Sequence, residues 1–246
     1  GHSLHIKDLS FKYDIYSPKD ILSNINLSIP NGKVTAIVGA SGSGKTTLIK
    51  LLLGFYEPLS GSIQIGSAHL SECNLGWWRS QCGAVMQGGY LFSDTIARNI
   101  AISDDEPDIE RIRHAARVAN IADYIEALPL AYNTMIGQDG QGISQGQRQR
   151  ILIARVVYKN PMFVFLDEAT NALDANNERA ITENLSDFYK GKTVVVVAHR
   201  LSTVRNADQI VVLDDGKIVE VGTHEELTSK RGKYFALVKN QLELGN

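Results

Sequence analysis

The sequence has little of several features that would each point to a particular class of protein. Of its 246 residues only two are cysteines, Cys73 and Cys82, and their spacing matches neither a zinc-binding pattern nor a redox pair, so both are expected to be reduced thiols. Its apolar stretches fall far short of the roughly 20 residues that cross a bilayer as a helix. The formal net charge is only -2, with both signs interspersed, so no nucleic-acid partner is expected.

The composition that remains is that of an ordinary globular domain. Hydrophobic residues make up 43% and charged residues 21%, which argues against both a disordered and a fibrous chain. The length suits one large α/β domain, or two small lobes that share a core. Residues 1–3 read Gly-His-Ser without a methionine and are expected to be a cloning remnant.

Apolar patterns predict two kinds of β-structure. Apolar and polar residues largely alternate from Leu4 to Tyr13 and from Ile21 to Ile29, which predicts half-buried strands in an antiparallel layer. Nearly continuous apolar runs are typical of strands that are buried on both faces of a parallel sheet. Four such runs are present, at residues 33–38, 162–166, 193–198 and 209–213.

The strongest local signal is a glycine-rich segment after the first of these apolar runs. It reads Gly39-Ala40-Ser41-Gly42-Ser43-Gly44-Lys45-Thr46-Thr47, and a helical pattern continues from it to Gly54. Glycines allow successive N–H groups to turn toward phosphate oxygens, and the helix presents its positive N-terminal end to the same anion. We expect Lys45 at the β- and γ-phosphates and Thr46 at Mg²⁺. The segment therefore predicts nucleotide binding.

Two carboxylates follow the second apolar run. Asp167 and Glu168 come directly after the residues Phe163-Val164-Phe165-Leu166, at the strand end where ligands of open α/β sheets bind. We expect Asp167 to hold Mg²⁺ through its coordination shell and Glu168 to polarise the attacking water. A strand that ends in acidic residues is common by itself, but together with the phosphate loop it predicts hydrolysis as well as binding.

These patterns predict an α/β fold with a phosphate-loop NTPase core. The core has a mostly parallel sheet, joined by an antiparallel β subdomain and a small α-helical subdomain that the spacing from Ile96 to Leu128 predicts. Residues 4–90 and 155–246 are assigned to the core with its antiparallel layer, and residues 91–154 to the helical subdomain. Terminal helices are expected from Gly222 to Leu242, where Thr223 and Glu226 form a capping-box pattern.

The order of these and further motifs resembles that of the ATP-binding cassette (ABC) proteins over nearly the whole chain. Gln87 looks like the glutamine of the family's Q-loop, which senses the metal and the γ-phosphate. His199 resembles the switch histidine, which contacts the γ-phosphate, and residues 171–174 (Asn-Ala-Leu-Asp) resemble the D-loop. The resemblance implies that ATP and Mg²⁺ bind, and it implies catalytic roles for Lys45, Gln87, Glu168 and His199 with Thr46, Gln87 and Asp167 at the metal.

Two further segments resemble nucleotide-contacting parts of the family. Residues 143–147 (Ile-Ser-Gln-Gly-Gln) resemble the signature, in which Ser144, Gly146 and Gln147 would contact ATP. Gln145 stands where the family usually has glycine, and a glutamine there would be strained if the position required positive φ. Tyr13 resembles the aromatic residue that stacks on adenine, with Tyr16 as a competitor. We expect activity to be retained, at most reduced.

The resemblance also implies partners. The phosphate loop and the signature of one domain cannot both reach one nucleotide, so a head-to-tail homodimer with two ATP molecules is implied. Residues 91–100 and 134–140 are similar to exporter coupling segments, which implies a transmembrane domain as partner and a place at the cytoplasmic face of the membrane for a domain that is itself soluble. Exporters of peptides or bacteriocins are a plausible subgroup.

Two other functions remain open alternatives. A soluble ABC ATPase of DNA repair or translation would act as a clamp, but the repair type needs a long coiled coil that residues 87–144 cannot hold, and the translation type joins two cassettes. A phosphate-loop GTPase or kinase would leave the signature, the D-loop and His199 unexplained.

Overall fold

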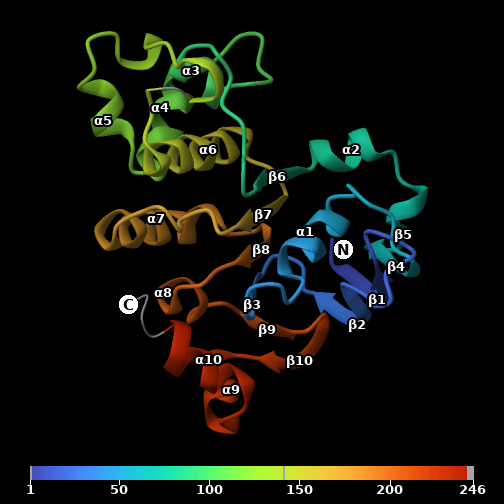
Figure 1. Cartoon of the computed structure of the whole chain (residues 1–246). Coiled ribbons are helices and arrows are strands. Elements are labelled where there is room, and N and C mark those ends of the chain that lie inside the picture. The colour runs from blue at the N-terminus through green and yellow to red at the C-terminus, as the bar shows by residue number, and fades with distance from the viewer. Residues whose placement is uncertain (1, 141, 243–246) are drawn as a thin grey trace. The chain divides into compact units, whose positions relative to one another are not determined.

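The computed structural model (Figure 1) describes residues 2–140 and 142–242. The chain divides into two compact units. The first unit is assembled from three stretches of chain and the second from two. The first comprises Gly1–Cys82, Met162–Asp167 and Gly191–Asn246, and the second comprises Gly83–Pro161 and Glu168–Lys190. The domain boundaries inferred from the sequence stay a prediction.

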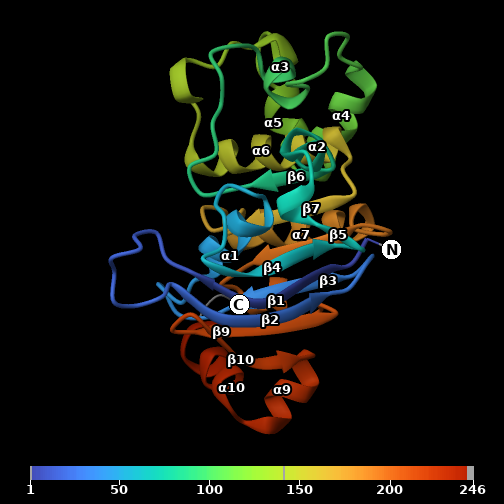
Figure 2. The ribbon, with the colours of Figure 1, turned by 90° about the vertical axis from the view of Figure 1, so that its right-hand side faces the viewer.

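An antiparallel sheet in the first unit contains both strands that the alternating patterns predict. Leu4 faces Ile29 on one neighbouring strand and Ile65 on the other, and all three side chains are buried, so one face of this sheet packs into the core. The first strand ends at Phe11, which leaves Tyr13 in the loop that follows. The strands lie in the order β2-β1-β4-β5 (Figure 2), with bounds β1 (Leu4–Phe11), β2 (Leu22–Ile29), β4 (Ser60–Ile65) and β5 (Ala68–His69).

The larger sheet of the first unit is mainly parallel, as the continuous apolar runs predict. β3 pairs in parallel with both β8 and β9, and β7 pairs in parallel with β8, whereas β10 is antiparallel to β9. Every residue of β7 and β8 is buried. The strands of this unit lie in the order β10-β9-β3-β8-β7, with bounds β3 (Val34–Val38), β7 (Phe163–Asp167), β8 (Thr193–Val197), β9 (Gln209–Asp214) and β10 (Lys217–Gly222).

Short helices accompany the two sheets of the first unit. Trp78 of α2 is fully buried, donates its indole N–H to the Leu52 carbonyl at 2.8 Å and packs against the Phe163 ring, which ties the end of α1 to β7. In the described ranges, no helix combines the length and the apolar character needed to cross a bilayer. The helical elements are α1 (Lys45–Leu52), η1 (Leu70–Glu72), α2 (Leu75–Ser80), α8 (Leu201–Val204), α9 (His224–Lys230), α10 (Lys233–Leu237) and η4 (Val238–Leu242).

The second unit is mainly helical, as the sequence predicts for residues 96–128. Strand β6 (Cys82–Val85) leads into it, and helix α6 packs against α3 and α4. Three buried alanines, Ala115, Ala116 and Ala119, have no bulky side chain, so backbones can approach closely there. The helical elements are α3 (Ile96–Ile100), α4 (Ile109–Val118), α5 (Ala122–Glu126), η2 (Ala131–Asn133), η3 (Gln138–Gly140), α6 (Gln145–Lys159) and α7 (Ala175–Phe188).

A buried asparagine holds the segment before α3 against α6. The side chain of Asn99 accepts a hydrogen bond from the Phe92 N–H at 2.7 Å and donates to the carbonyls of Phe92 and Thr95 at 3.0 Å each. Arg155 of α6 donates to the Asn99 carbonyl at 2.8 Å and to the Tyr90 carbonyl at 2.9 Å. Burial lowers the pKa of Arg155 to about 10, and the nearby Arg148 adds to this effect. The guanidinium nevertheless stays charged at neutral pH.

We expect Asn99→Ala to lower the free energy of unfolding by about 2–4 kcal/mol, because the four hydrogen bonds of the Asn99 side chain disappear, including one that it accepts from the Arg155 guanidinium, and buried polar groups lose their partner. Urea denaturation measures this change. Asn176→Ala, at an exposed asparagine of α7, is the matched control and should change the value by less than about 0.5 kcal/mol. A loss below about 1 kcal/mol for Asn99→Ala would contradict the structural role assigned to this side chain.

Candidate nucleotide-binding site

The glycine-rich loop after β3 has the backbone conformation that its sequence predicts. At Gly39 a Cβ atom would lie 2.3 Å from the Leu213 carbonyl oxygen and 2.7 Å from the Ser43 hydroxyl oxygen, so no side chain fits there. Gly44, which precedes α1, has φ +105°, a conformation that residues with a side chain rarely adopt. The loop therefore leads directly into the N-terminus of α1, where free N–H groups favour an anion.

Lys45 is buried inside this loop. Only 6% of it is exposed, and its ammonium donates to the carbonyl oxygens of Gly39 at 2.6 Å and Ala40 at 3.0 Å. A buried ammonium that is held by carbonyl groups keeps a positive charge within the curve of the loop. The contact of Lys45 with the terminal phosphates of a nucleotide stays a prediction, and an ammonium within this loop is able to make it.

The hydroxyl of Ser43 also fits a phosphate ligand. Ser43 is 3% exposed, and its Oγ has no hydrogen-bond partner among the described residues. Its backbone is fixed, since the Ser43 N–H donates to the Ala40 carbonyl at 3.1 Å and its carbonyl accepts from the Gly216 N–H at 3.0 Å. Buried hydroxyl groups normally find a partner, and a phosphate oxygen held in the loop would supply one.

The acidic strand end and the loop lie at the same edge of the parallel sheet. Val197 of β8 pairs with Ile37 of β3 on one side and with Asp167 of β7 on the other. Asp167 is thus level with a residue two positions before the loop begins, and it is only 1% exposed. His199 follows β8, which lies between β3 and β7, and it is exposed. The structure therefore brings the loop, Asp167 and His199 to one sheet edge.

The oxygen donors at this edge suit a hard cation. Thr46, in the first turn of α1, offers a partly exposed hydroxyl, and Asp167 offers a carboxylate. Within residues 2–140 and 142–242, no group of three or more His, Cys, Asp and Glu side chains could hold a metal ion by itself. Mg²⁺ in nucleotide sites typically takes only one or two protein ligands and completes its shell with phosphate and water. These two residues therefore fit Mg²⁺ bound together with a nucleotide.

Tyr13 stands beside the phosphate loop. Its hydroxyl and the hydroxyl of Thr47 are 2.8 Å apart and share a hydrogen bond. Its ring meets the rings of Phe11 and Tyr56 edge-on and is 51% exposed, so neither ring stacks face to face on it. Tyr16 is 88% exposed. The geometry favours Tyr13 as the residue that could stack on a base.

In the second unit, Gln87 and Glu168 each occupy a turn that follows a strand. Gln87 is exposed and directly precedes Gly88, which has φ +76°. Glu168 has φ +53°, although residues with a side chain pay about 1–2 kcal/mol for this left-handed conformation. Backbone strain of this kind occurs preferentially at functional sites. Seven other described residues with a side chain, among them Ala131 and Arg231, also have positive φ, so this conformation characterises the turn and does not by itself assign a function to Glu168.

The signature residues form the start of α6. Ser144 caps the helix: its hydroxyl oxygen accepts from the Gln147 N–H at 3.1 Å, and the Gln147 side-chain oxygen accepts from the Ser144 N–H at 3.0 Å. The hydroxyl hydrogen of Ser144 can still be donated to a ligand. At Gly146 a Cβ would lie 3.3 Å from the Ala172 carbonyl oxygen, which leaves little room for a side chain. Gln145 is the first residue of α6 and does not have positive φ, so the strain considered for it does not arise.

One contact in this unit was not predicted. The Gln149 side-chain amide of α6 donates to the Asn171 side-chain oxygen and to the Glu168 carbonyl, and its oxygen accepts from the Ala172 N–H at 3.0 Å. It thereby holds the turn that contains Glu168. A polar residue two positions after the signature was the only sequence signal for it.

Asp174, the last residue of the D-loop segment, caps α7. A hydrogen bond from the Asn177 N–H lowers the pKa of Asp174, so it caps the helix as an anion.

The chain is similar in sequence to a known protein family over most of its length. Residues 22–171 match a family model described as ABC transporter. The chain is 44% identical over 243 residues to ATP-binding cassette sub-family B member 10, mitochondrial, of Mus musculus, covering 97% of this chain and 34% of that protein. It is also 44% identical over 241 residues to the leukotoxin translocation ATP-binding protein LktB of Mannheimia haemolytica, covering 98% of this chain and 34% of LktB.

A solved structure is similar as well. The structure of a bacterial Atm1-family ABC exporter with ATP bound superimposes with a TM-score of 0.92 at 37% sequence identity, covering 97% of this chain and 41% of that chain. The chain thus spans about a third of the length of the curated relatives named above.

Proposed function

Because the chain belongs to the ABC transporter family, we propose that it is the ATP-driven motor domain of an exporter. The ATP-binding domains of this family are ATPases, and the fold is that of a phosphate-loop ATPase. The observation that supports the proposal most is the convergence of the phosphate loop with its buried Lys45, Asp167 and His199 at one edge of the parallel sheet.

In the proposed site, the first unit holds the nucleotide. The N–H groups of residues 39–47 and the Lys45 ammonium would offset the charge of the triphosphate, and the Tyr13 ring would support the adenine. Thr46 and Asp167 would hold Mg²⁺ together with Gln87. When bound, this ion would neutralise charge that develops on the phosphate oxygens.

Hydrolysis in this proposal depends on Glu168 and His199. The Glu168 carboxylate would accept a hydrogen bond from the attacking water and orient it in line with the γ-phosphate. The imidazole of His199 would donate a hydrogen bond to the γ-phosphate. Neither residue forms a covalent bond to the substrate, because phosphoryl transfer of this kind depends on positioning and electrostatics.

The second unit would complete the site of another copy. Helix α6 has 15 residues and presents the positive end of its dipole at Ser144, next to Gly146 and Gln147. A head-to-tail homodimer would place these residues over the triphosphate that the phosphate loop of the other copy holds. A transmembrane domain, fused or separate, would be driven by closing and opening of this dimer at the cytoplasmic face of the membrane.

We expect the Mg²⁺-dependent ATPase activity per molecule to increase with the concentration of the 246-residue protein, because two copies are needed for each complete site. Steady-state hydrolysis over a hundredfold range of protein concentration, paired with sedimentation in the presence of ATP, measures this. A constant activity per molecule from a protein that stays monomeric with ATP would contradict the shared site.

A further inference from the structure

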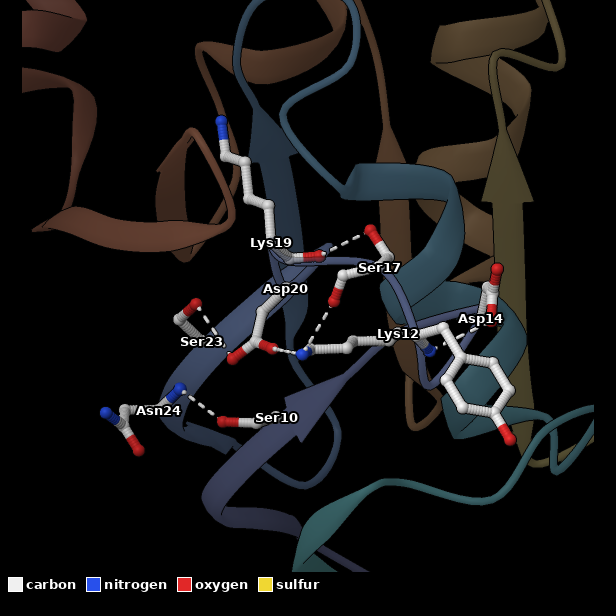
Figure 3. Close-up of polar contacts among 9 residues, drawn as sticks. Ser10, Lys12, Asp14, Ser17, Lys19, Asp20, Ser23 and Asn24 are labelled. Carbon is white, nitrogen blue, oxygen red and sulfur yellow. Dashed lines mark hydrogen bonds and ion pairs between the residues drawn. The ribbon is translucent and has the colours of Figure 1, made fainter.

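The loop between β1 and β2 carries Tyr13 and contains a polar brace. The Lys12 ammonium donates to the Ser17 carbonyl at 2.9 Å and lies 3.6 Å from the Asp20 carboxylate (Figure 3). One ammonium thus ties the start of the loop to both its middle and its end. We call this arrangement of Lys12, Ser17 and Asp20 the Lys12 brace.

Hydrogen bonds fix the base of the loop, whereas its outer part has a local turn, in which the Ser17 N–H donates to the Asp14 carbonyl at 3.0 Å and the Tyr16 N–H donates to the Asp14 carboxylate at 2.9 Å. The Ile21 N–H donates to the Phe11 carbonyl at 2.8 Å, and the Asn24 N–H donates to the Ser10 hydroxyl at 3.0 Å. Ser23 adds a hydrogen bond of 3.4 Å to the Asp20 carboxylate. Lys12 directly follows Phe11 and Asp20 directly precedes Ile21, so the brace adjoins this closed base.

The outer part of the loop has no apolar anchor of its own. Ile15 is 68% exposed and Tyr16 is 88% exposed, so burial of these side chains does not hold the loop in place. By contrast, the side chains of Lys12 and Asp20 are 19% and 28% exposed, which makes their attraction less screened than that of a surface pair. Lys19 of the loop also pairs with Asp215 at 2.5 Å, but these side chains are 69% and 67% exposed, so water and salt screen this pair. The conformation of the loop therefore depends on the less exposed Lys12 brace more than on packing or on this surface pair.

Tyr13 follows Lys12 directly, and this links the brace to the nucleotide site. The Tyr13 ring contacts the rings of Phe11 and Tyr56, and its hydroxyl reaches Thr47 at 2.8 Å. These contacts act on the half-exposed side chain and do not by themselves fix the backbone of the loop that follows it. We propose that Lys12 is a positioning residue, which holds the loop so that the Tyr13 ring is preorganised to receive the adenine. This inference rests on the proposed function, in which Tyr13 supports the base.

Preorganisation has a measurable consequence. A ligand that binds only one loop conformation has an apparent Kd that rises as the population of that conformation falls. Removing the Lys12 ammonium should lower that population, so we expect Lys12→Met to raise the Kd of ATP about threefold to tenfold. Lys12→Arg keeps the positive charge and the hydrogen-bond donors, so its Kd of ATP should stay close to that of the parent protein. The methionine retains most of the apolar stem.

The deciding comparison is between ATP and inorganic tripolyphosphate, which lacks the base. Calorimetry in Mg²⁺-free buffer, where ATP is not turned over, gives both Kd values for the parent protein, Lys12→Met and Tyr13→Ala. Both variants should raise the Kd of ATP and leave the Kd of tripolyphosphate unchanged. Lys190→Met removes a lysine from an exposed ion pair with Asp187 and is the matched control, which should change neither value. Thermal unfolding shows whether each variant is folded. If Lys12→Met is unfolded, Asp20→Asn takes its place in the comparison.

The possible outcomes separate this inference from the proposed function. If Tyr13→Ala raises the Kd of ATP but Lys12→Met does not, the positioning role of Lys12 is wrong, and the role of Tyr13 in supporting the adenine stands. If Lys12→Met raises the Kd of tripolyphosphate as much as the Kd of ATP, the brace acts on the phosphate loop, and the inference is again wrong. If Tyr13→Ala changes the Kd of neither ligand, Tyr13 does not support the adenine, and the inference about Lys12 is wrong as well.

Discussion

Replacing Lys45 with methionine is expected to raise the Kd of ATP about 100-fold or more, because hydrogen bonds from an ammonium to phosphate oxygens are charge-assisted and strong. The ammonium donates to carbonyl groups inside the phosphate loop, and only 6% of Lys45 is exposed, so little water competes for it. Calorimetry with ATP measures the loss directly. An independent measure is the ATP-induced rise in Tm, which should disappear since ligand stabilisation depends on the ratio of ligand concentration to Kd.

The matched control for this prediction lies on the same helix. Lys50→Met removes a partly exposed lysine from the last turn of α1, far along the helix from the loop, and should leave the Kd of ATP within about twofold. An ATP affinity for Lys45→Met within tenfold of the parent value would mean that the loop does not hold the triphosphate in the way proposed.

Glu168→Gln is expected to lower the rate of ATP hydrolysis by about 10²–10⁴-fold while the Kd of ATP stays nearly the same. The amide has the shape of the carboxylate but cannot accept a proton from water, so the loss falls on the chemical step. Because bound ATP is then not consumed, the ATP-bound dimer should accumulate. Single-turnover hydrolysis measures the first effect, and size-exclusion chromatography with ATP measures the second.

Glu183→Gln, an exposed position on α7, is the control and should hydrolyse ATP at the parent rate. The backbone of Glu168 has φ +53°, and glutamine keeps the same Cβ and the same strain, so Glu168→Gln should have the Tm of the parent protein. Hydrolysis within tenfold of the parent rate would remove Glu168 from the mechanism and leave another group to orient the water.

Features that depend on local pattern could be predicted from the sequence. The continuous apolar runs that become β7 and β8 are fully buried, and the glycine spacing after β3 gives the expected loop. The predicted α/β fold class and the resemblance to the ABC family are confirmed. The phosphate-loop motif can be recognised without a structure, because its glycines and its lysine lie within one short segment whose spacing follows from the local backbone turn around the phosphates.

Features that depend on distant backbone groups could not be predicted. Asn99, Gln149 and Arg155 act mainly on carbonyl and N–H groups of other segments, and every residue type offers those groups. Lys12 is a similar case, because its hydrogen-bond partner is the carbonyl of Ser17. The end of β1 was also misplaced: alternation runs on to Tyr13, but the hydrogen bond from Ile21 to Phe11 closes the loop two residues earlier.

The position of β3 in the sheet has a consequence for how the protein folds. Its two neighbours, β8 and β9, come from the last third of the chain, with Val34 paired to Val194 and Thr35 to Gln209. Contacts between residues so far apart are slow to form, because a long loop must close first. During synthesis, β3 leaves the ribosome long before either neighbour exists, with both of its edges unpaired and open to wrong partners. The strand that carries the phosphate loop is thus made early, but its place in the sheet is completed late.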